Sequence, residues 1–383
     1  MVKKITCNLI ALVFMASLLG FSHAPLPPKS GEVIRVAIVK GKPLVRLLIK
    51  GPFGVYSLNT NELLAEYRGL DTSVVTPTDF GLQIGTFSYF KIYGIKIVPK
   101  RDAAIYVDKR CFRGQIDIIR QQDKTLLIVN HIDVENYIRG VLYHEVSHKW
   151  PLESIKAQAV AARTYALYQK KINEKNDFDV TNDVYSQVYG GQTSEKYRTN
   201  KAVNQTLGEY LTFKGEVFPA YFHAACAGHT EDASRLWNID LPPLKGKPCD
   251  FCGKSPHSKW KINLRLADIQ VKLIKSGKEI GLIKEINVLE RNNSGRVEKL
   301  EIIDRRGSKI YISGKDFRMV VGPDIIRSTN FEVIMRGYYV DFVGKGWGHG
   351  VGLCQWGAKS MSECGFTYDQ ILKYYYPGSE ISK

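Results

Sequence analysis

The sequence has 383 residues and a formal net charge of +16, with 44% hydrophobic and 24% charged residues. This length allows two or three compact modules with a substantial core, and the composition is that of an ordinary globular protein. The positive charge favours polyanionic partners. We do not expect nucleic acid as the partner, because the basic residues are scattered along the chain and no motif that reads DNA or RNA is present.

Residues 1–24 have the pattern of a signal peptide or an N-terminal anchor. Two lysines precede an apolar run from Ile5 to Phe21, and Ser22-His23-Ala24 resembles a cleavage site. We therefore expect export to the periplasm or cell envelope. Pro25 hinders cleavage at that site, and an uncleaved segment would be the one membrane contact of the chain. Loss of the leader and its two lysines would leave a charge of +14, which suits an acidic polymer of the cell wall.

Residues 25–129 are predicted to form an N-terminal β-rich region. From Val33 to Val129, short runs rich in β-branched and aromatic residues, such as VIRVAIV and TLLIV, alternate with Gly, Pro and Asn. This alternation is typical of a β domain or of half of one.

Residues 130–207 are predicted to form a helical segment. The pattern predicts one helix from Asp133 to Leu142 and a second that begins at Pro151, a residue well suited to a first helical turn. The apolar stripe of the second helix indicates core packing. Lys156 and Arg163 fall on its other faces, where they could point toward Glu145.

Residues 208–383 are predicted to form a second β-rich part with a short helix near its end, roughly Thr367 to Tyr375. Asn292-Asn293-Ser294-Gly295 predicts a hairpin turn. The run GWGHGVGLCQWGA, at residues 346–358, is too polar and too rich in glycine for a packed core, and it is predicted to be a ligand-binding loop. The whole pattern predicts an α+β fold in which β-rich domains surround a central helical segment.

Six cysteines follow the leader, and three of them lie close to histidines. The spacing Cys-x2-Cys suits two thiolates of a tetrahedral metal site. We predict a structural zinc ion bound by Cys226, His229, Cys249 and Cys252, with His223 and His257 as alternatives for the histidine. Disulfides and free thiols are the alternatives to zinc binding. An even number of cysteines in an exported protein also allows disulfides.

His144-Glu145-Val146-Ser147-His148 matches the HExxH pattern of zinc metalloproteases. Pro151 follows so closely that the helix has little room for both histidines, and no third ligand follows at a recognisable spacing. A second interpretation makes Glu145 a lone general acid and base, shielded beside Trp150 so that it keeps its proton near neutrality. Nearby Glu135 is interpreted as part of a solvated helix face. Ordinary glycosidases use two carboxylates, but one suffices when a hydroxyl of the sugar itself attacks.

A set of motifs that spans nearly all of the chain carries a resemblance to a known family. In chain order they are NYIRGV (136–141) with Glu145, IKAQAVAARTY (155–165), SQVYGG (186–191), FHAACAGHT (222–230), SG-x2-FR (313–318), GWGHGVGLCQWGA (346–358) and IL-x2-YYPG (371–378). On these motifs the chain resembles the SpoIID/LytB family of sporulation and cell-wall proteins. Cys354 stands where that family usually has serine.

The resemblance implies a lytic transglycosylase, a lyase that cuts peptidoglycan glycan strands between N-acetylmuramic acid and N-acetylglucosamine. It implies strands without stem peptides as the substrate, a cell-wall amidase as a partner, and sporulation or cell division as the setting. No cofactor is required for this chemistry. The alternative is a non-catalytic amidase enhancer or glycan-binding protein, because the LytB branch shares the domain.

The resemblance also implies roles for individual residues. Glu145 matches the catalytic acid of the family, and Lys156 and Arg163 match basic residues held close to that acid. Trp347 is a candidate to stack on a sugar ring. The positions implied to line the glycan groove are Gln187, Tyr189, His349 and Gln355.

Overall fold

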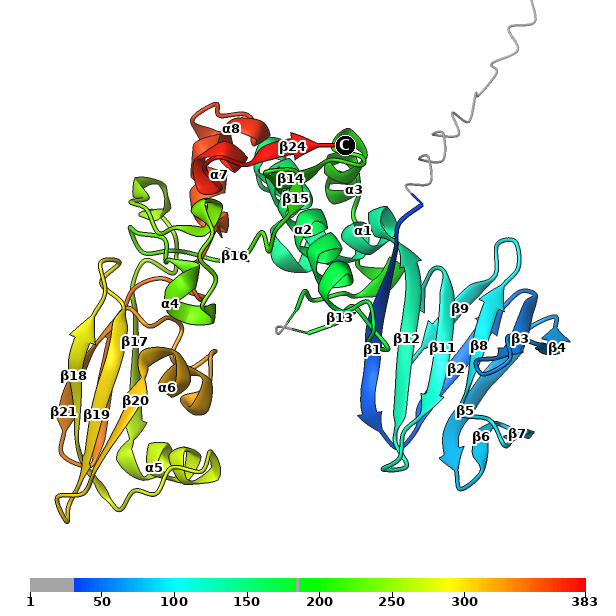
Figure 1. The fold of residues 1–383 in the computed structure, drawn as a ribbon, viewed down its shortest axis with the longest axis horizontal. Helices are drawn as coiled ribbons and strands as arrows, with labels where there is room; N and C mark the ends of the chain where they lie inside the picture. Colours follow the sequence, from blue (N-terminus) through cyan, green and yellow to red (C-terminus); the bar gives the residue numbers. More distant parts are fainter. Residues whose placement is uncertain (1–30, 184–185) are drawn as a thin grey trace, which may run out of the picture.

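The computed structural model describes residues 31–183 and 186–383 and confirms the α+β fold class (Figure 1). The predicted leader, residues 1–24, lies outside the described residues. None of the described helices is both long and apolar enough to span a membrane.

The N-terminal part of the described chain forms two sheets that share one hydrophobic core, with strand orders β13-β1-β12-β11-β8-β3-β4 and β10-β9-β2-β5-β6-β7. In β2, residues 45, 47 and 49 are buried and alternate with more exposed neighbours, as expected for a strand with one face on a core. The first sheet consists of β1 (Val33–Lys42), β3 (Phe53–Ser57), β4 (Leu63–Tyr67), β8 (Gly94–Pro99), β11 (Gln115–Arg120), β12 (Leu126–Asp133) and β13 (Val180–Thr181). The second consists of β2 (Val45–Lys50), β5 (Leu70–Thr78), β6 (Gly81–Ile84), β7 (Phe87–Phe90), β9 (Ala104–Val107) and β10 (Arg110–Phe112).

Three helices follow, namely α1 (Val134–Glu145), α2 (Leu152–Ile172) and α3 (Tyr197–Gln205). Asp133 caps α1 by accepting hydrogen bonds from the first backbone N–H groups of the helix. Helix α1 continues three residues past its predicted end and stops at Glu145, where the next residue is extended. Helix α2 begins at Leu152, one residue after its predicted start, and Pro151 is its N-cap.

Helix α2 is the centre of the molecule, because it packs against two cores at once (Figure 1). Ile155, Ala159 and Ala162 belong to the core of the N-terminal sheets. Ala157 and Val160, on another face, belong to the core of the C-terminal part. Small side chains around the helix let both cores approach it closely, so that its polar residues Gln158 and Arg163 are also buried.

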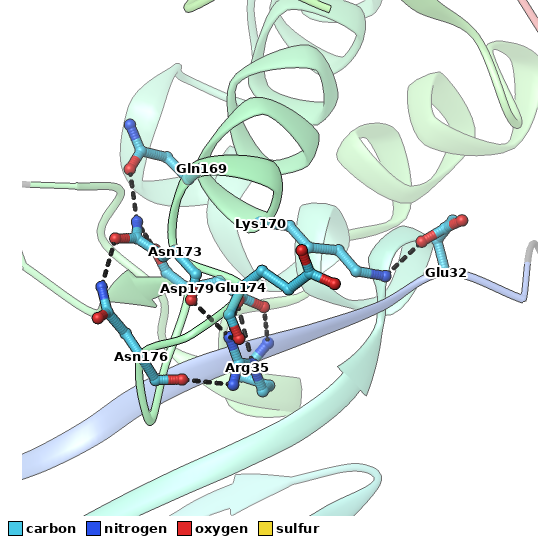
Figure 2. Close-up of polar contacts among 8 residues, drawn as sticks. All are labelled: Glu32, Arg35, Gln169, Lys170, Asn173, Glu174, Asn176 and Asp179. Carbon is cyan, nitrogen blue, oxygen red and sulfur yellow. Dashed lines mark hydrogen bonds and ion pairs between the residues drawn. The ribbon is translucent and has the colours of Figure 1, made fainter.

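The C-terminal end of α2 is fastened to β1 by Arg35 (Figure 2). The Arg35 guanidinium donates to Oδ1 of Asp179 from Nε at 3.0 Å, and its Nη2 donates to the carbonyl oxygen of Asn173 at 2.8 Å. The backbone N–H of Arg35 donates to Oδ2 of Asp179 at 2.8 Å. Lys170 of α2 forms a further ion pair with Glu32, the residue before β1.

The second core lies under short elements that are far apart in sequence. Strand β16 (Phe222–His223) pairs in parallel with β23 (Leu353–Cys354), which brings together two loops about 130 residues apart in the sequence. The remaining elements of this part are β14 (Tyr210–Phe213), β15 (Glu216–Val217), α4 (Ala233–Trp237), α7 (Gln355–Glu363), α8 (Tyr368–Tyr375) and β24 (Glu380–Ser382). Helix α8 confirms the predicted final helix.

Between these segments, the chain forms a unit with a third core of its own. It has two three-stranded sheets, with orders β17-β22-β21 and β18-β19-β20. The turn at residues 292–295 joins β18 to β19 as predicted, and Gly295 has the positive φ of 77° that favours glycine there. The elements of this unit are β17 (Trp260–Arg265), α5 (Leu266–Lys275), β18 (Ile283–Arg291), β19 (Val297–Asp304), β20 (Lys309–Ser313), α6 (Gly314–Val321), β21 (Phe331–Arg336) and β22 (Tyr339–Gly344).

Candidate active-site cleft

A cleft of about 610 Å³ opens between the helical centre and the unit that carries α6. Segments that are far apart in the sequence line it, among them the end of α1, the middle of α2, the loop around β16, α4, α6 with the residues after it, and the glycine-rich loop. Four residues predicted from sequence to act in the site line this cleft, namely Glu145, Trp347, His349 and Gln355.

Glu145 is the last residue of α1, so the end of the helix directs its side chain into the cleft. Burial among protein atoms raises the pKa of Glu145 from its ordinary value of 4.5 to about 7. Hydrogen bonds from the backbone N–H of Val188 and from the side chain of Gln355 oppose this rise. The position at the C-terminal end of a helix acts with burial, because the helix dipole places partial negative charge there. Near neutral pH, this carboxyl is therefore able both to give and to take a proton.

Aromatic side chains form much of the cleft wall. Tyr221 and Trp237 stack with their ring centroids 4.3 Å apart, and His257 meets the Trp347 ring edge-on at 4.6 Å. All four residues, together with Tyr165, line the cleft. Such surfaces suit the apolar faces of sugar rings while leaving polar atoms at the edges for hydroxyl groups.

Tyr165, Tyr221 and Trp237 were not predicted as cleft residues. Tyr165 belongs to the motif IKAQAVAARTY, and Tyr221 directly precedes the motif that begins at Phe222, so both had a positional signal. Trp237 had no such signal in the sequence, because it reaches the cleft only through the placement of α4.

The glycine-rich loop depends on its glycines because it passes close to other parts of the chain. At Gly348, with φ of 108°, an added Cβ would lie 2.8 Å from the Cβ of His223. At Gly350, with φ of 93°, it would lie 2.5 Å from the buried Arg296 guanidinium. These contacts and the positive φ angles explain the spacing that the sequence shows.

His349 in this loop is held as a neutral imidazole. Its Nδ1 accepts from the backbone N–H of Val351 at 3.1 Å, and its Nε2 donates to the carbonyl oxygen of Phe222 at 2.9 Å. Burial, with the nearby His223 and Arg318, holds the pKa of His349 well below its usual range. His349 therefore shapes the cleft and does not supply a proton at neutral pH.

Arg163 does not reach the cleft, which corrects the expectation that it lies beside Glu145. Its side chain is 1% exposed, and its Nε and Nη2 donate to the two carboxylate oxygens of Glu135 at 2.8 and 2.6 Å. Glu135 is likewise buried rather than solvated. The reason is the second core on α2, which turns this polar face of the helix into an interior surface.

Three further residues expected to contact the glycan or the acid also face elsewhere. The Tyr189 hydroxyl donates to Asn130 Oδ1 at 3.0 Å, and Gln187 accepts from the Tyr137 hydroxyl at 3.0 Å, both inside the protein. Both side chains are about 1% exposed. Lys156 pairs with Glu153 at 2.6 Å and does not line the cleft.

The HExxH pattern does not form a metal site. Because α1 ends at Glu145 and Val146 is extended, His144 and His148 do not share one helical face. His144 Nε2 lies 2.7 Å from the Ser194 hydroxyl, within hydrogen-bond distance. Within residues 31–183 and 186–383, the cysteine cluster described next is the one grouping of three or more potential metal ligands.

Four buried cysteines, one of them in the glycine-rich loop, form a cluster. The sulfur atoms of Cys226, Cys249, Cys252 and Cys354 all lie within 4.8 Å of one another. A tetrahedral zinc ion with Zn–S bonds of about 2.3 Å separates its sulfurs by about 3.8 Å, so this donor set fits zinc. Hydrogen bonds from Cys226, then from Cys249 and Cys354, lower the pKa of Cys252, and a thiolate is the form that binds metal.

The fourth member of the cluster is Cys354 rather than a histidine. Instead, His229 Nδ1 donates to the carbonyl oxygen of Thr230 at 2.6 Å. His257 packs against Trp347 in the cleft. His223 donates from Nδ1 to the carbonyl oxygen of Val351 at 3.0 Å, and burial lowers the pKa of His223 to about 3. Its Nε2 is buried and has no hydrogen-bond partner in the described part of the chain.

Comparisons with known proteins agree with this architecture. The family model described as Stage II sporulation protein, SpoIID, matches residues 122–213, which include α1, Glu145 and α2. A model described as a domain of unknown function, DUF8618, matches residues 252–352, which include the unit from β17 to β22 and most of the glycine-rich loop.

Three relatives are similar over large parts of the chain. The stage II sporulation protein D of Bacillus subtilis is 30% identical over 270 residues, which are 67% of this chain and 76% of that protein. An uncharacterized protein of Brachyspira hyodysenteriae is 32% identical over 351 residues, 91% of this chain and 93% of that protein. The amidase enhancer of Bacillus subtilis is 27% identical over 292 residues, or 64% of this chain, and the match spans 40% of that longer protein.

The fold and the cleft define an α+β protein whose central helical segment presents a carboxyl of raised pKa to an aromatic cleft. By its similarity to stage II sporulation protein D and by the family model, the chain belongs to the SpoIID family. This membership supports a cell-wall-related role and, at the level of the family, a peptidoglycan-related enzyme.

Proposed function

We propose that the protein is an exported lytic transglycosylase that cuts peptidoglycan glycan strands between N-acetylmuramic acid and N-acetylglucosamine. The observation that carries the proposal is the carboxyl of Glu145, whose pKa is raised to about 7 inside a cleft lined by aromatic side chains. An ordinary glutamate would be ionised at neutral pH and would have no proton to give to a leaving oxygen.

In the proposed reaction, protonated Glu145 donates its proton to the glycosidic oxygen as the bond to the muramic C1 breaks. The resulting carboxylate then takes the proton of the muramic C6 hydroxyl while that oxygen bonds to C1 and closes the 1,6-anhydro ring. One carboxyl serves both steps and is protonated again at the end. The other carboxylate that lines the cleft within the described residues is Asp324, which is exposed and belongs to the segment after α6.

Groups around Glu145 suit the polar parts of a glycan. Gln355 and the Val188 N–H stabilise the ionised form of Glu145 between the two steps. Trp347, Trp237 and Tyr221 suit the ring faces.

We further propose that the four-cysteine cluster binds a structural zinc ion. Zinc would fasten the Cys226 loop, the Cys249–Cys252 turn and the start of α7 to one another. The ion would have no direct role at Glu145.

An amidase partner, or a role as a non-catalytic amidase enhancer, is the second candidate. It is favoured by the similarity to the protein named amidase enhancer. In that case the cleft would bind glycan, and Glu145 would not cut it.

Incubation of the full chain with purified glycan strands in water enriched in ¹⁸O separates these functions. A lytic transglycosylase gives 1,6-anhydro ends without ¹⁸O, because no water enters the product. A hydrolase gives reducing ends that carry ¹⁸O. Intact strands together with faster peptide release by an added cell-wall amidase would contradict the proposal and identify an enhancer. Asp324→Asn is the matched control, and we expect it to keep the anhydro products.

A further inference from the structure

Arg318, on the wall of the cleft supplied by α6, is a fixed guanidinium without a carboxylate partner. Its Nε donates to the carbonyl oxygen of Ile326 at 2.9 Å, and its Nη2 donates to that of Pro323 at 3.2 Å. Across the described residues, Arg318 forms no ion pair with a carboxylate, and its guanidinium hydrogen bonds are those two to carbonyl oxygens. The side chain lines the cleft.

This arrangement leaves a positive charge without a counter-charge in contact. Burial lowers the pKa of Arg318 to about 10, although the exposed Asp324 carboxylate acts in the opposite direction from a distance. The two carbonyl oxygens orient the guanidinium but carry no net charge. Taking a charge out of water in this way destabilises a protein unless an anion compensates it. A preoriented guanidinium is also the side chain best suited to a carboxylate.

The position of Arg318 places this charge inside the cleft and apart from Glu145. The positive charge of Arg318 contributes to the low pKa of His349, so the two side chains are close. Phe317, the preceding residue on α6, belongs to the core of the unit between β17 and β22, whereas Glu145 is held by the helical centre. Lys315, one turn earlier on α6, adds a second cation at the exposed edge of the same wall.

We propose that Arg318 is the carboxylate-binding residue of the cleft and recognises an acidic sugar by its free acid group. The chemical class of the ligand is a saccharide that carries a carboxylate, and in the proposed substrate this group is the lactyl carboxylate of muramic acid. The inference rests on the proposed function only in assuming that a glycan occupies the cleft. It assigns a selective role to the unit that carries α6: strands with free lactyl carboxylates are bound, and strands whose lactyl groups are amide-linked to peptides lose this contact.

The test measures binding rather than cleavage, so that it is independent of the proposed reaction. The full chain with Glu145→Gln is titrated calorimetrically with a tetrasaccharide that contains free lactyl carboxylates. The same tetrasaccharide with its carboxylates converted to methylamides, and neutral chitotetraose, serve as probes. Arg318→Gln is then added to Glu145→Gln. Arg305→Gln is the control for charge, because Arg305 is exposed and outside the cleft.

We expect Arg318→Gln to weaken binding of the carboxylate tetrasaccharide by about tenfold to a hundredfold, the usual range for a charge-assisted pair. Binding of the two neutral probes should change less than about twofold, and Arg305→Gln should leave all three unchanged. Equal losses for acidic and neutral saccharides would overturn the proposal, because the guanidinium would then only hold the Pro323–Ile326 turn. Unchanged binding of the acidic ligand, or no saccharide binding at all, would overturn it as well. Failure of the wild type to cut strands, with Arg318-dependent binding intact, would refute the proposed reaction alone.

Discussion

The side chain of Gln355 meets the carboxyl of Glu145 in the cleft, across about 210 residues of sequence, and lowers the pKa of that carboxyl. Gln355 directly follows Cys354, whose sulfur belongs to the four-cysteine cluster and whose residue caps α7. One peptide bond therefore separates the candidate metal site from a residue that touches the candidate acid. A zinc ion bound at Cys354, as proposed, would hold the backbone from which Gln355 meets Glu145.

The pH dependence of catalysis should follow the protonation of Glu145. Because the acid step requires the protonated carboxyl, kcat/KM should be level below pH 7 and fall about tenfold per pH unit above it. Gln355→Ala removes a donor that lowers the pKa of Glu145. The variant should therefore move the alkaline limb of the kcat/KM profile to higher pH while reducing kcat/KM. Trp347→Ala, which lines the cleft, should raise KM and leave the limb in place. An unshifted limb in Gln355→Ala would show that this hydrogen bond does not tune Glu145.

The raised pKa of Glu145 should also appear in the stability of the fold. The folded state holds the proton at pH values where the unfolded chain, with a pKa near 4.5, has lost it. The stabilisation of the fold by this bound proton is therefore fully present below pH 4.5 and is lost as the pH rises through about 7. A shift from 4.5 to about 7 corresponds to at most about 3 kcal/mol, reduced by the opening of the cleft to solvent. Relative to the wild type, the unfolding free energy of Glu145→Gln should therefore increase by roughly 1–2 kcal/mol as the pH rises from 4 to 8. Urea unfolding at each pH measures this difference. A difference independent of pH would contradict the raised pKa.

Arg163 should be essential for stability and not for the chemistry. Arg163→Met leaves Glu135 buried without its partner and should cost about 3–5 kcal/mol of unfolding free energy. The double variant with Glu135→Leu should recover much of that loss, because two apolar side chains replace the ion pair. Lys171→Met, which breaks an exposed pair at the end of the same helix, should change stability by less than about 1 kcal/mol. A glycan-binding role would instead leave the unfolding midpoint of Arg163→Met unchanged and raise KM.

The four-cysteine cluster should bind one zinc ion per chain, measurable by elemental analysis of the purified protein. Cys354→Ser should lose most of the metal and more than about 4 kcal/mol of unfolding free energy, because a buried metal site is lost. Cys364→Ser is the control, since Cys364 is exposed and outside the cluster. Metal-free protein with unchanged stability, or two cluster cysteines protected from alkylation as a disulfide, would contradict the zinc assignment.

Much of the fold follows from local sequence patterns. The β-rich start, α8 and the turn at residues 292–295 follow from periodicity and turn residues, and α1 was placed correctly except for its last turn. Glu145 was found through its motif, and the structure adds the burial that raises its pKa.

The side chains that were misplaced depend on packing between distant segments. Arg163, Gln187 and Tyr189 were expected near the glycan because local sequence does not show that α2 lies between two cores. The alanines around α2, Ala157 and Ala161 in addition to the predicted stripe, were the available signal of burial on more than one side. Cys354 joins the cluster through the pairing of β16 with β23, and its only sequence signal was a cysteine where the family usually has serine.

The most direct test of the role of Glu145 is the yield of 1,6-anhydromuramic ends from denuded glycan strands, measured by mass spectrometry for the wild type and Glu145→Gln. The two proteins are compared at equal concentration after circular dichroism has established that both are folded. We predict a loss of at least about 1,000-fold in the rate of anhydro-end formation, with strand binding retained. Anhydro ends formed by Glu145→Gln at the wild-type rate would contradict the assignment of Glu145 as the acid and base.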